Sequence, residues 1–167
     1  LSNPGDAAVF SRAEVLGERA MKMFATPDAG PWEFRGMERA HTFSAVMCWA
    51  ACDRLARIAA QLKITGRAAF WRGSADAMRE EILRRAWSDD KQAFTGGFDG
   101  EELDATSLLL PDLGFIEATD SRFASTLQAI ERELVRGDLV YRYRHADDFG
   151  VPGNTFTMCS FWYVNEI

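Results

Sequence analysis

Residues 42–62, TFSAVMCWAACDRLARIAAQL, determine the predicted fold of this chain. Apolar residues recur in this stretch at intervals of three or four, as they do on one face of an α-helix: Met47, Ala51, Leu55, Ile58 and Leu62. The first half is apolar on nearly every side, and a helix of that kind is buried on several sides. The sequence therefore predicts a long inner helix from about Thr42 to Leu62.

Capping residues predict a helix on either side of this one. Ser11 and Glu14 form a capping box for a helix that runs to about Phe24, with the apolar stripe Val15, Leu16, Ala20, Met23 and Phe24. Two prolines and a glycine within residues 27–31 then end regular structure. Ser74 is expected to cap a further helix, whose apolar residues are Ala75, Met78, Ile82 and Ala86.

The second half of the chain carries more caps of the same kind. Asp104 is expected to cap a short helix that ends at Pro111, and Asp120 to open a helix that Gly137 closes. The apolar residues of that second helix are Phe123, Leu127, Ile130 and Leu134. A last helix begins near Asn154, and only residues 139–144 have the composition of a strand.

About six helices of this type predict an all-α fold. Helices that are apolar on most sides alternate along the chain with helices that have a single apolar face. This alternation indicates helical hairpins packed side by side in an inner and an outer layer. The helix lengths vary too much for a regular repeat array.

Length, composition and charge limit the classes of protein and partner. The chain has 167 residues, 47% of them hydrophobic, which predicts a single domain over residues 1–167. Its net charge is -6 with acids and bases mixed, so we expect no nucleic-acid partner. No apolar run approaches the ~20 residues that span a bilayer, so we expect no membrane partner. The chain begins at Leu1 without methionine and is expected to be an excerpt of a longer protein.

The three cysteines, Cys48, Cys52 and Cys159, lie among apolar neighbours. Their odd number fits reduced thiols and predicts a cytoplasmic protein. Cys48 and Cys52 would share a helical face, with His41 upstream, but this spacing matches no zinc pattern. We therefore interpret both cysteines as packing residues, and expect no metal and no cofactor.

Residues 28–36, DAGPWEFRG, contain the first candidate for chemistry. If Trp32 covers Glu33, the carboxyl group loses solvation and its pKa rises, as a general acid near neutral pH requires. The alternative is a surface loop in which Glu33 pairs with Arg35.

The second candidate lies in residues 139–144. Arg142 stands between two tyrosines, of which Tyr143 is a candidate sugar-stacking surface, and a guanidinium can fix neighbouring hydroxyl groups. The alternative is a structural arginine in an aromatic sandwich. Asp104 fits a helix cap better than a catalytic group.

Several motifs together resemble the catalytic-acid region of bacterial glycoside hydrolase family 15. They occur in the family's order and spacing over nearly the whole chain: residues 28–36, 41–49, 53–54, 103–105, 108–111, 114–115, 120–122, 141–143 and 159–162. The chain departs from the family pattern at Pro31, where an aliphatic residue is usual, and at Ala45, where a lysine is common.

The resemblance implies an (α/α)6 toroid, of which this chain forms about half. It also implies hydrolysis of α-glucosidic bonds with inversion, as in glucoamylases, glucodextranases and bacterial trehalases. Glu33 matches the catalytic general acid, while Trp32, Arg35, Arg142 and Tyr143 are the expected substrate-binding residues.

The family's general base lies in a later segment, which the resemblance places outside this chain. We therefore expect the chain to be inactive alone and to form a homodimer through open helical edges. The alternative is a non-catalytic carbohydrate-binding or interaction remnant.

Overall fold

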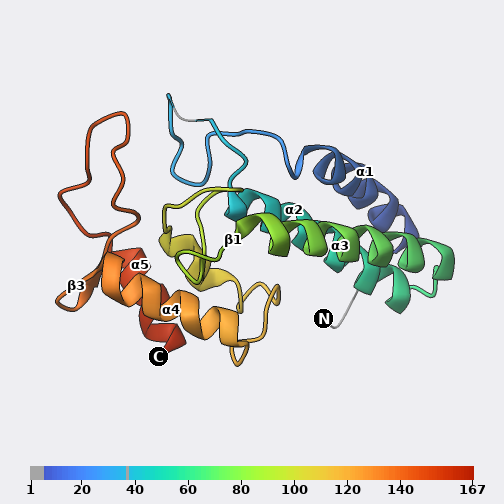
Figure 1. Ribbon diagram of the computed structural model, residues 1–167. Coiled ribbons are helices and arrows are strands. Elements are labelled where there is room, and N and C mark those ends of the chain that lie inside the picture. Colours follow the sequence, from blue (N-terminus) through green and yellow to red (C-terminus); the bar gives the residue numbers. More distant parts are fainter. Residues whose placement is uncertain (1–5, 37) are drawn as a thin grey trace.

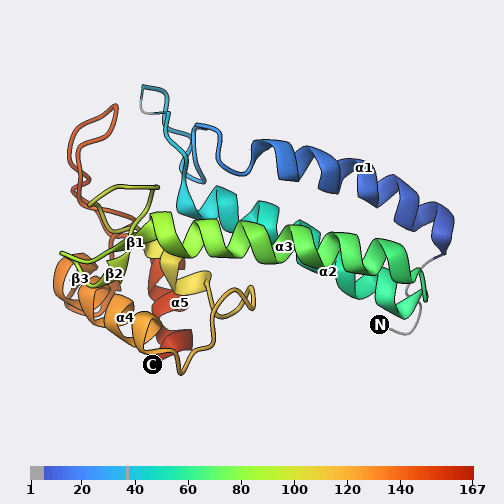
Figure 2. The same ribbon diagram turned by 45° about the vertical axis from the view of Figure 1, so that its right-hand side comes forward.

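The computed structural model describes residues 6–36 and 38–167, within which five α-helices dominate. The three longest, α1 (Ala7–Met23), α2 (Thr42–Gln61) and α3 (Thr65–Ala86), lie side by side, and we call them the helical layer. The shorter α4 (Ser121–Leu134) and α5 (Thr157–Glu166) lie beyond the end of this layer (Figures 1 and 2). The predicted helix-rich class is confirmed.

Helices α2 and α3 form a hairpin whose turn is a helix C-cap. Lys63 has φ +61, and the Ile64 amide donates to the Ala59 carbonyl at 2.9 Å, which is the Schellman arrangement. The predicted inner helix is confirmed within one residue. Its buried face is broader than the predicted stripe, however, because Val46 and Ala59 are fully buried while Met47 is 46% exposed.

Helix α3 begins nine residues before the predicted cap. Ser74 lies inside the helix, where its hydroxyl donates to the Phe70 carbonyl at 2.9 Å, so its assignment as a cap was wrong. The extra turns are retained because Trp71 is completely buried against the neighbouring helices, and this packing outweighs the low helix propensity of Gly66 and Gly73. The predicted buried residues Ala75, Met78, Ile82 and Ala86 are confirmed.

Helix α1 differs from its prediction in both start and face. Its N-cap is Asp6, which accepts from the Val9 amide at 2.9 Å, so the capping box at Ser11 was wrong. Leu16 is 70% exposed, whereas Phe10 and Gly17 face the core. A Cβ at Gly17 would collide with Leu55 and lie 2.8 Å from Trp71. The absence of a side chain at this position, which a hydrophobicity pattern cannot score, therefore sets the buried face.

A second core lies under α4 and α5. Asp104 caps the short 3-10 helix η1 (Ala105–Leu109) by accepting from the Thr106 amide, and Asp120 caps α4 by accepting from the Arg122 amide. Both predicted caps are confirmed. Helix α5 begins three residues after the predicted start at Asn154. The buried members of this core are Ala93, Leu103, Ala105, Leu108, Ala129, Ile130, Leu134, Val140 and Cys159.

Two short antiparallel hairpins complete the described structure. Strands β1 (Trp87–Ser88) and β2 (Ala93–Phe94) pair after α3, and β3 (Val135–Arg136) and β4 (Leu139–Val140) pair after α4. Only the latter falls near the predicted strand. Gly137, expected to close α4, instead forms the β3–β4 turn with φ +61.

Two further expectations from the sequence concern the cysteines and a membrane partner. Cys52 is completely buried, and burial raises the pKa of its thiol to about 11, consistent with packing. Among the described residues, no helix combines the length and apolarity needed to cross a bilayer.

Candidate active site

The loop that carries Glu33, residues 28–36, is closed at its base by backbone pairing. The Asp28 amide donates to the Arg39 carbonyl at 3.0 Å, and the Asp28 side chain accepts from the Gly30 amide at 2.6 Å. Within this acid loop the Phe34 amide donates to the Ala29 carbonyl at 2.8 Å. The chain is thus folded into a compact turn with Glu33 near its tip.

Glu33 itself is exposed and adopts a left-handed backbone conformation with φ +57. The residues that the structure describes therefore do not produce the loss of solvation expected at Glu33. Glu33 forms no ion pair with any described residue, so the alternative pairing with Arg35 is absent as well. A carboxyl group presented in this way is free to meet a ligand.

Trp32 is fixed by a hydrogen bond that sequence reasoning missed. Its indole Nε1 donates to Asp104 Oδ2 at 2.8 Å, across 72 residues of sequence. Its ring also contacts Phe156 and Trp162, with centroids at 5.9 and 6.2 Å. Trp32 is half-buried and held in one orientation beside Glu33.

Asp104 does more than cap η1. Its carboxylate is 2% exposed and accepts three hydrogen bonds, from the Thr106 amide at 2.8 Å, the Thr106 hydroxyl at 2.7 Å and Trp32. Burial raises the pKa of Asp104, although these donors act against the rise. A capping pattern predicts only the Thr106 contacts, so the sequence carried no signal for the bond to Trp32.

Arg142 lies over the same aromatic surface. Its guanidinium carbon is 5.5 Å from the Trp32 ring, 5.2 Å from Tyr143 and 5.7 Å from Phe156. The guanidinium donates no hydrogen bond to another residue of the described chain. Arg142 is therefore in the aromatic sandwich anticipated as the alternative, yet its donors remain available to a ligand.

Tyr143 lies behind this surface, in a stack of rings. Phe34 contacts His41, Tyr143 and His145 at 5.6, 5.2 and 5.8 Å, and Tyr143 stacks on His145 at 4.5 Å. Together with Trp32 we call these residues the aromatic cluster. Tyr143 is 1% exposed and its hydroxyl donates to Asp147 at 2.7 Å, while burial raises its pKa. Its contact with a sugar stays a prediction, and its observed contacts are supporting ones.

The aromatic cluster also contains two histidines. His41 and His145 have ring nitrogens that are buried and form no hydrogen bond within the described residues. Burial, and then the nearby charge of Arg39, lower the pKa of both imidazoles. Both are therefore neutral packing groups beneath the acid loop.

Arg35 is held through its backbone and not through its side chain. Its side chain is exposed, while its backbone amide donates to Asp148 Oδ2 at 2.7 Å. The structure thus brings Trp32, Arg142 and Tyr143 into contact, with Glu33 adjacent in the chain. It does not bring Arg35 to them, and the role of its side chain in substrate binding stays a prediction.

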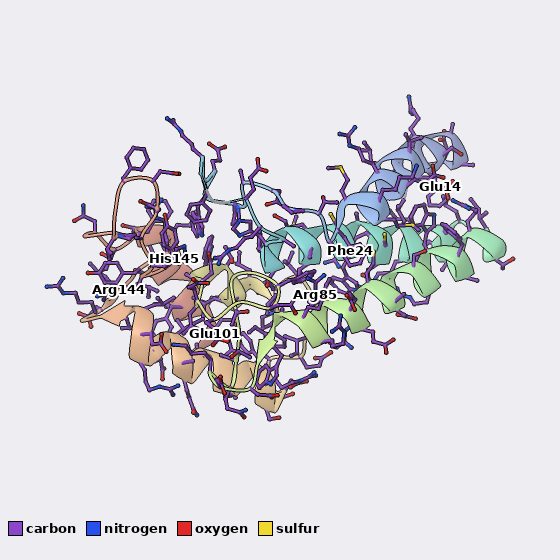
Figure 3. All side chains as sticks on the ribbon, turned by 45° about the horizontal axis from the view of Figure 1, so that its top comes forward. Glu14, Phe24, Arg85, Glu101, Arg144 and His145 are labelled. Carbon is purple, nitrogen blue, oxygen red and sulfur yellow. The ribbon has the colours of Figure 1, made fainter. Side chains whose placement is uncertain are left out.

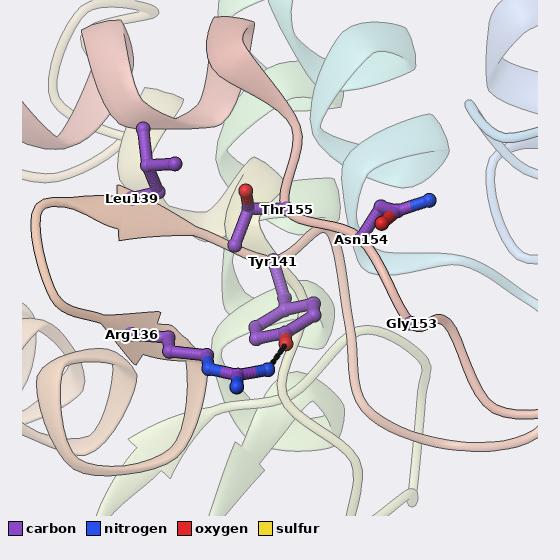
Figure 4. Close-up of a pocket in the computed structure, with 6 residues that line it drawn as sticks. All are labelled: Arg136, Leu139, Tyr141, Gly153, Asn154 and Thr155. Carbon is purple, nitrogen blue, oxygen red and sulfur yellow. Dashed lines mark hydrogen bonds between the residues drawn. The ribbon is translucent and has the colours of Figure 1, made fainter.

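One cavity adjoins the aromatic cluster, and another lies apart from it. The first, of about 360 Å³, lies between the acid loop's base and the segment after Tyr143, lined by Glu38, Arg39, Glu102, His145 and Ala146. The second cavity, of about 430 Å³, lies beside the β3–β4 hairpin (Figure 4). Neither Trp32 nor Glu33 lines it. Its lining residues are Arg136, Leu139, Tyr141, Gly153, Asn154 and Thr155. Figure 3 places His145 and Arg144 at the end of the molecule opposite Glu14.

Comparison with known proteins places the chain in a family. The family model for glycosyl hydrolases family 15 matches residues 12–167. A trehalase of Mycobacterium tuberculosis is 40% identical over 153 residues, which are 90% of this chain and 22% of that protein. A trehalase of Thermoplasma volcanium is 36% identical over 142 residues, covering 84% of this chain and 23% of that protein. The chain thus spans about a quarter of the length of these relatives.

Solved structures agree at the level of fold. A glycosidase variant in complex with glucose superposes with a TM-score of 0.73 at 14% identity, over 92% of this chain and 40% of that chain. A second glycosidase variant gives a TM-score of 0.74 at 13% identity, with the same coverage. From the match of the family model and the identity to the trehalases, it follows that the chain belongs to glycosyl hydrolases family 15.

Proposed function

We propose that this chain supplies the general acid, Glu33, of an inverting α-glucosidic hydrolase. In such a reaction the acid protonates the leaving glycosidic oxygen, while a base on the other face of the sugar activates water. The two carboxyl groups stand ~6.5–9.5 Å apart to leave room for that water. We place the base outside residues 1–167, and regard these residues as one part of an (α/α)6 catalytic domain.

The observation that carries this proposal is the contact of Arg142 with Trp32, the residue that directly precedes Glu33. Trp32 is held by Asp104, and the Arg142 guanidinium lies 5.5 Å from the Trp32 ring with its donors available. A flat apolar face next to a two-pronged donor suits a sugar, whose faces stack on rings and whose hydroxyls accept hydrogen bonds. Glu33 follows Trp32 directly in the chain, and its side chain is exposed.

We propose trehalose as the substrate, in preference to a maltooligosaccharide or a dextran. The support for this choice is the similarity to proteins named trehalase, at 40% and 36% identity. The reduced thiols Cys48, Cys52 and Cys159 support a cytoplasmic location for the proposed enzyme.

The decisive test is Glu33→Gln in the natural protein at its full length. The amide keeps the shape of the side chain but cannot donate the proton, so turnover of trehalose should fall by several orders of magnitude. Glu38→Gln, an exposed glutamate at the base of the same loop, is the matched control and should keep normal turnover. Near-normal turnover in Glu33→Gln would exclude Glu33 as the acid.

The second candidate function is carbohydrate binding without catalysis. The free guanidinium of Arg142 beside Trp32 favours it equally, because neither group needs a base to bind a sugar. Arg142→Lys should weaken sugar binding in both cases, since an ammonium lacks the planar fork of donors. Turnover by the full-length protein decides between them: glucose release supports the hydrolase, and binding without release supports the second candidate.

We also propose that the isolated chain associates with a second copy and is inactive. Most of the apolar surface of α2 is covered within the chain, although Met47 is 46% exposed. Exposed apolar side chains occur on several elements, among them Val15 at 65% and Leu16 at 70% on α1, and Phe161 at 70% and Val164 at 63% on α5. Exposed apolar patches of this kind drive association. Sedimentation that shows a monomer at micromolar concentration would refute the association, and glucose release by the isolated chain would refute its inactivity.

A further inference from the structure

Two hydrogen bonds from distant segments hold the acid loop on either side of Glu33. On the N-terminal side, the Trp32 indole donates to Asp104. On the C-terminal side, the Arg35 amide donates to Asp148 Oδ2 at 2.7 Å, across 113 residues of sequence. Glu33 lies between these two anchors. The second anchor, the bond to Asp148, takes no part in the proposed proton transfer itself.

Asp148 is presented by a turn that is itself fixed. The amide and carbonyl groups of Asp147 and Gly150 bond to each other at 3.0 Å in both directions. The Asp147 carboxylate accepts from the Tyr143 hydroxyl and from the Phe149 amide, each at 2.7 Å. Asp148 therefore projects from a turn that is tied to the aromatic cluster.

The acid loop is shaped to receive this carboxylate. Gly36 has no side chain, and a Cβ built there would lie 2.8 Å from Asp148 Oδ1. One carboxylate oxygen thus bonds to the Arg35 amide while the other lies against Gly36. A side chain at position 36 would therefore shift the Asp148 carboxylate, although the backbone φ of Gly36 is not positive.

The conformation of Glu33 explains what such an anchor would do. A glutamate with φ +57 occupies a sparsely populated region, which persists only where the surroundings enforce it. We propose that Asp148 is a positioning residue, which acts through the Arg35 amide to keep Glu33 in the geometry for proton donation. This inference rests on the proposed role of Glu33 as the general acid.

Two substrates that differ in leaving group test the proposal in the full-length protein. Cleavage of trehalose breaks a C–O bond, and the leaving sugar oxygen takes its proton from the acid. Cleavage of α-glucosyl fluoride breaks a C–F bond and releases fluoride without that proton, while water attacks in both cases and gives its proton to the base. Asp148→Ala should lower kcat on trehalose on the order of ten- to a hundredfold. It should leave kcat on the fluoride and both KM values nearly unchanged.

Conservative and matched variants separate positioning from general damage. Asp148→Asn should retain most of the trehalose turnover, because an amide oxygen still accepts from the Arg35 amide. Asp138→Ala, an exposed aspartate in the β3–β4 turn, should match the parent on both substrates. Equal losses on both substrates in Asp148→Ala, or no loss on either, would overturn the proposal.

The two proposals fail in different ways. If Glu33 is not the acid, Glu33→Gln keeps normal trehalose turnover whatever Asp148 variants do. If Glu33 is the acid but Asp148 does not position it, only Glu33→Gln discriminates between the two substrates. Amide hydrogen exchange of residues 28–36 in the full-length protein adds a readout without catalysis. Faster exchange in Asp148→Ala than in Asp148→Asn is expected, and identical exchange in both would contradict the anchor.

Discussion

The helical layer and the aromatic cluster are stabilised in different ways. In the helical layer, α2 and α3 pack along their lengths through small and aliphatic residues, of which Val46, Ala59 and Ala75 are completely buried. In the aromatic cluster, loops are held by ring contacts and by a few long-range hydrogen bonds, such as those from Trp32 to Asp104 and from Arg35 to Asp148.

This difference determines how each region should respond to a substitution. Burial in the helical layer is distributed over many residues, so stability there depends on the volume removed. Geometry in the aromatic cluster depends on individual polar anchors, so one lost acceptor should disturb local structure more than its volume implies. Stability and site geometry should therefore be separable by mutation.

The largest expected effect on stability is in the helical layer. Trp71→Ala should lower the free energy of unfolding by about 3–5 kcal/mol, because it removes a completely buried indole. It also removes the indole Nε1 that donates a hydrogen bond to Glu14 of α1 at 2.7 Å. Urea denaturation measures the loss, and Phe70→Ala, 42% exposed on the same helix, should cost much less. Similar losses in the two variants would contradict the packing of α1 on α3.

The next effect tests the aromatic cluster. Asp104→Ala should cost about 2–3 kcal/mol, because it leaves buried donors on Trp32 and Thr106 without their acceptor. It should also change the near-ultraviolet circular dichroism of the tryptophans, since Trp32 loses its fixed orientation. Asp120→Ala, the cap of α4, should cost about 1 kcal/mol and leave that spectrum unchanged. An unchanged spectrum in Asp104→Ala would show that ring contacts alone hold Trp32.

A smaller effect distinguishes two glycines of the helical layer. Gly17→Ala should destabilise by about 1–2 kcal/mol, because overpacking against Leu55 and Trp71 outweighs the gain in helix propensity. Gly73→Ala on α3 has nothing within 4 Å of the added Cβ and should stabilise by up to about 1 kcal/mol. Thermal unfolding of both variants gives the comparison directly. A stabilising Gly17→Ala would mean that α1 packs less closely than the structure shows.

The same contrast explains what the sequence could predict. Helix α2 and the caps Asp104 and Asp120 follow local patterns, so they were predicted correctly. The face of α1 was mispredicted because close approach at Gly17 is a tertiary effect. The partners of Trp32 and Arg35 lie 72 and 113 residues away, and no local pattern encodes such distances. Glu33, Trp32 and Arg142 were selected as candidates from the residue types of their segments, and the family resemblance then suggested their roles, which stay predictions. His41 and His145 had no sequence signal beyond their residue type.

The smallest expected effect concerns His41 and His145 and depends on pH. Burial is the larger cause that lowers the pKa of both rings, and the charge of Arg39 is the second. Asp28 and Asp104 raise the pKa of His41. Glu102, Asp104 and Asp147 raise the pKa of His145. The lowering causes prevail, so the pKa of each ring in the folded state lies below its ordinary value of 6.5. Both rings therefore stay neutral at a pH where they would be protonated in the unfolded chain. The unfolded chain binds protons there, so stability is fully present above about pH 6.5 and is lost as the pH falls toward the folded pKa values. Urea denaturation at about pH 7.5 and about pH 5.5 should show this loss, and His41→Phe and His145→Phe should each reduce it. If both variants lose as much stability as the parent between these two pH values, the pH dependence belongs to carboxyl groups. The histidines would then be packing residues alone.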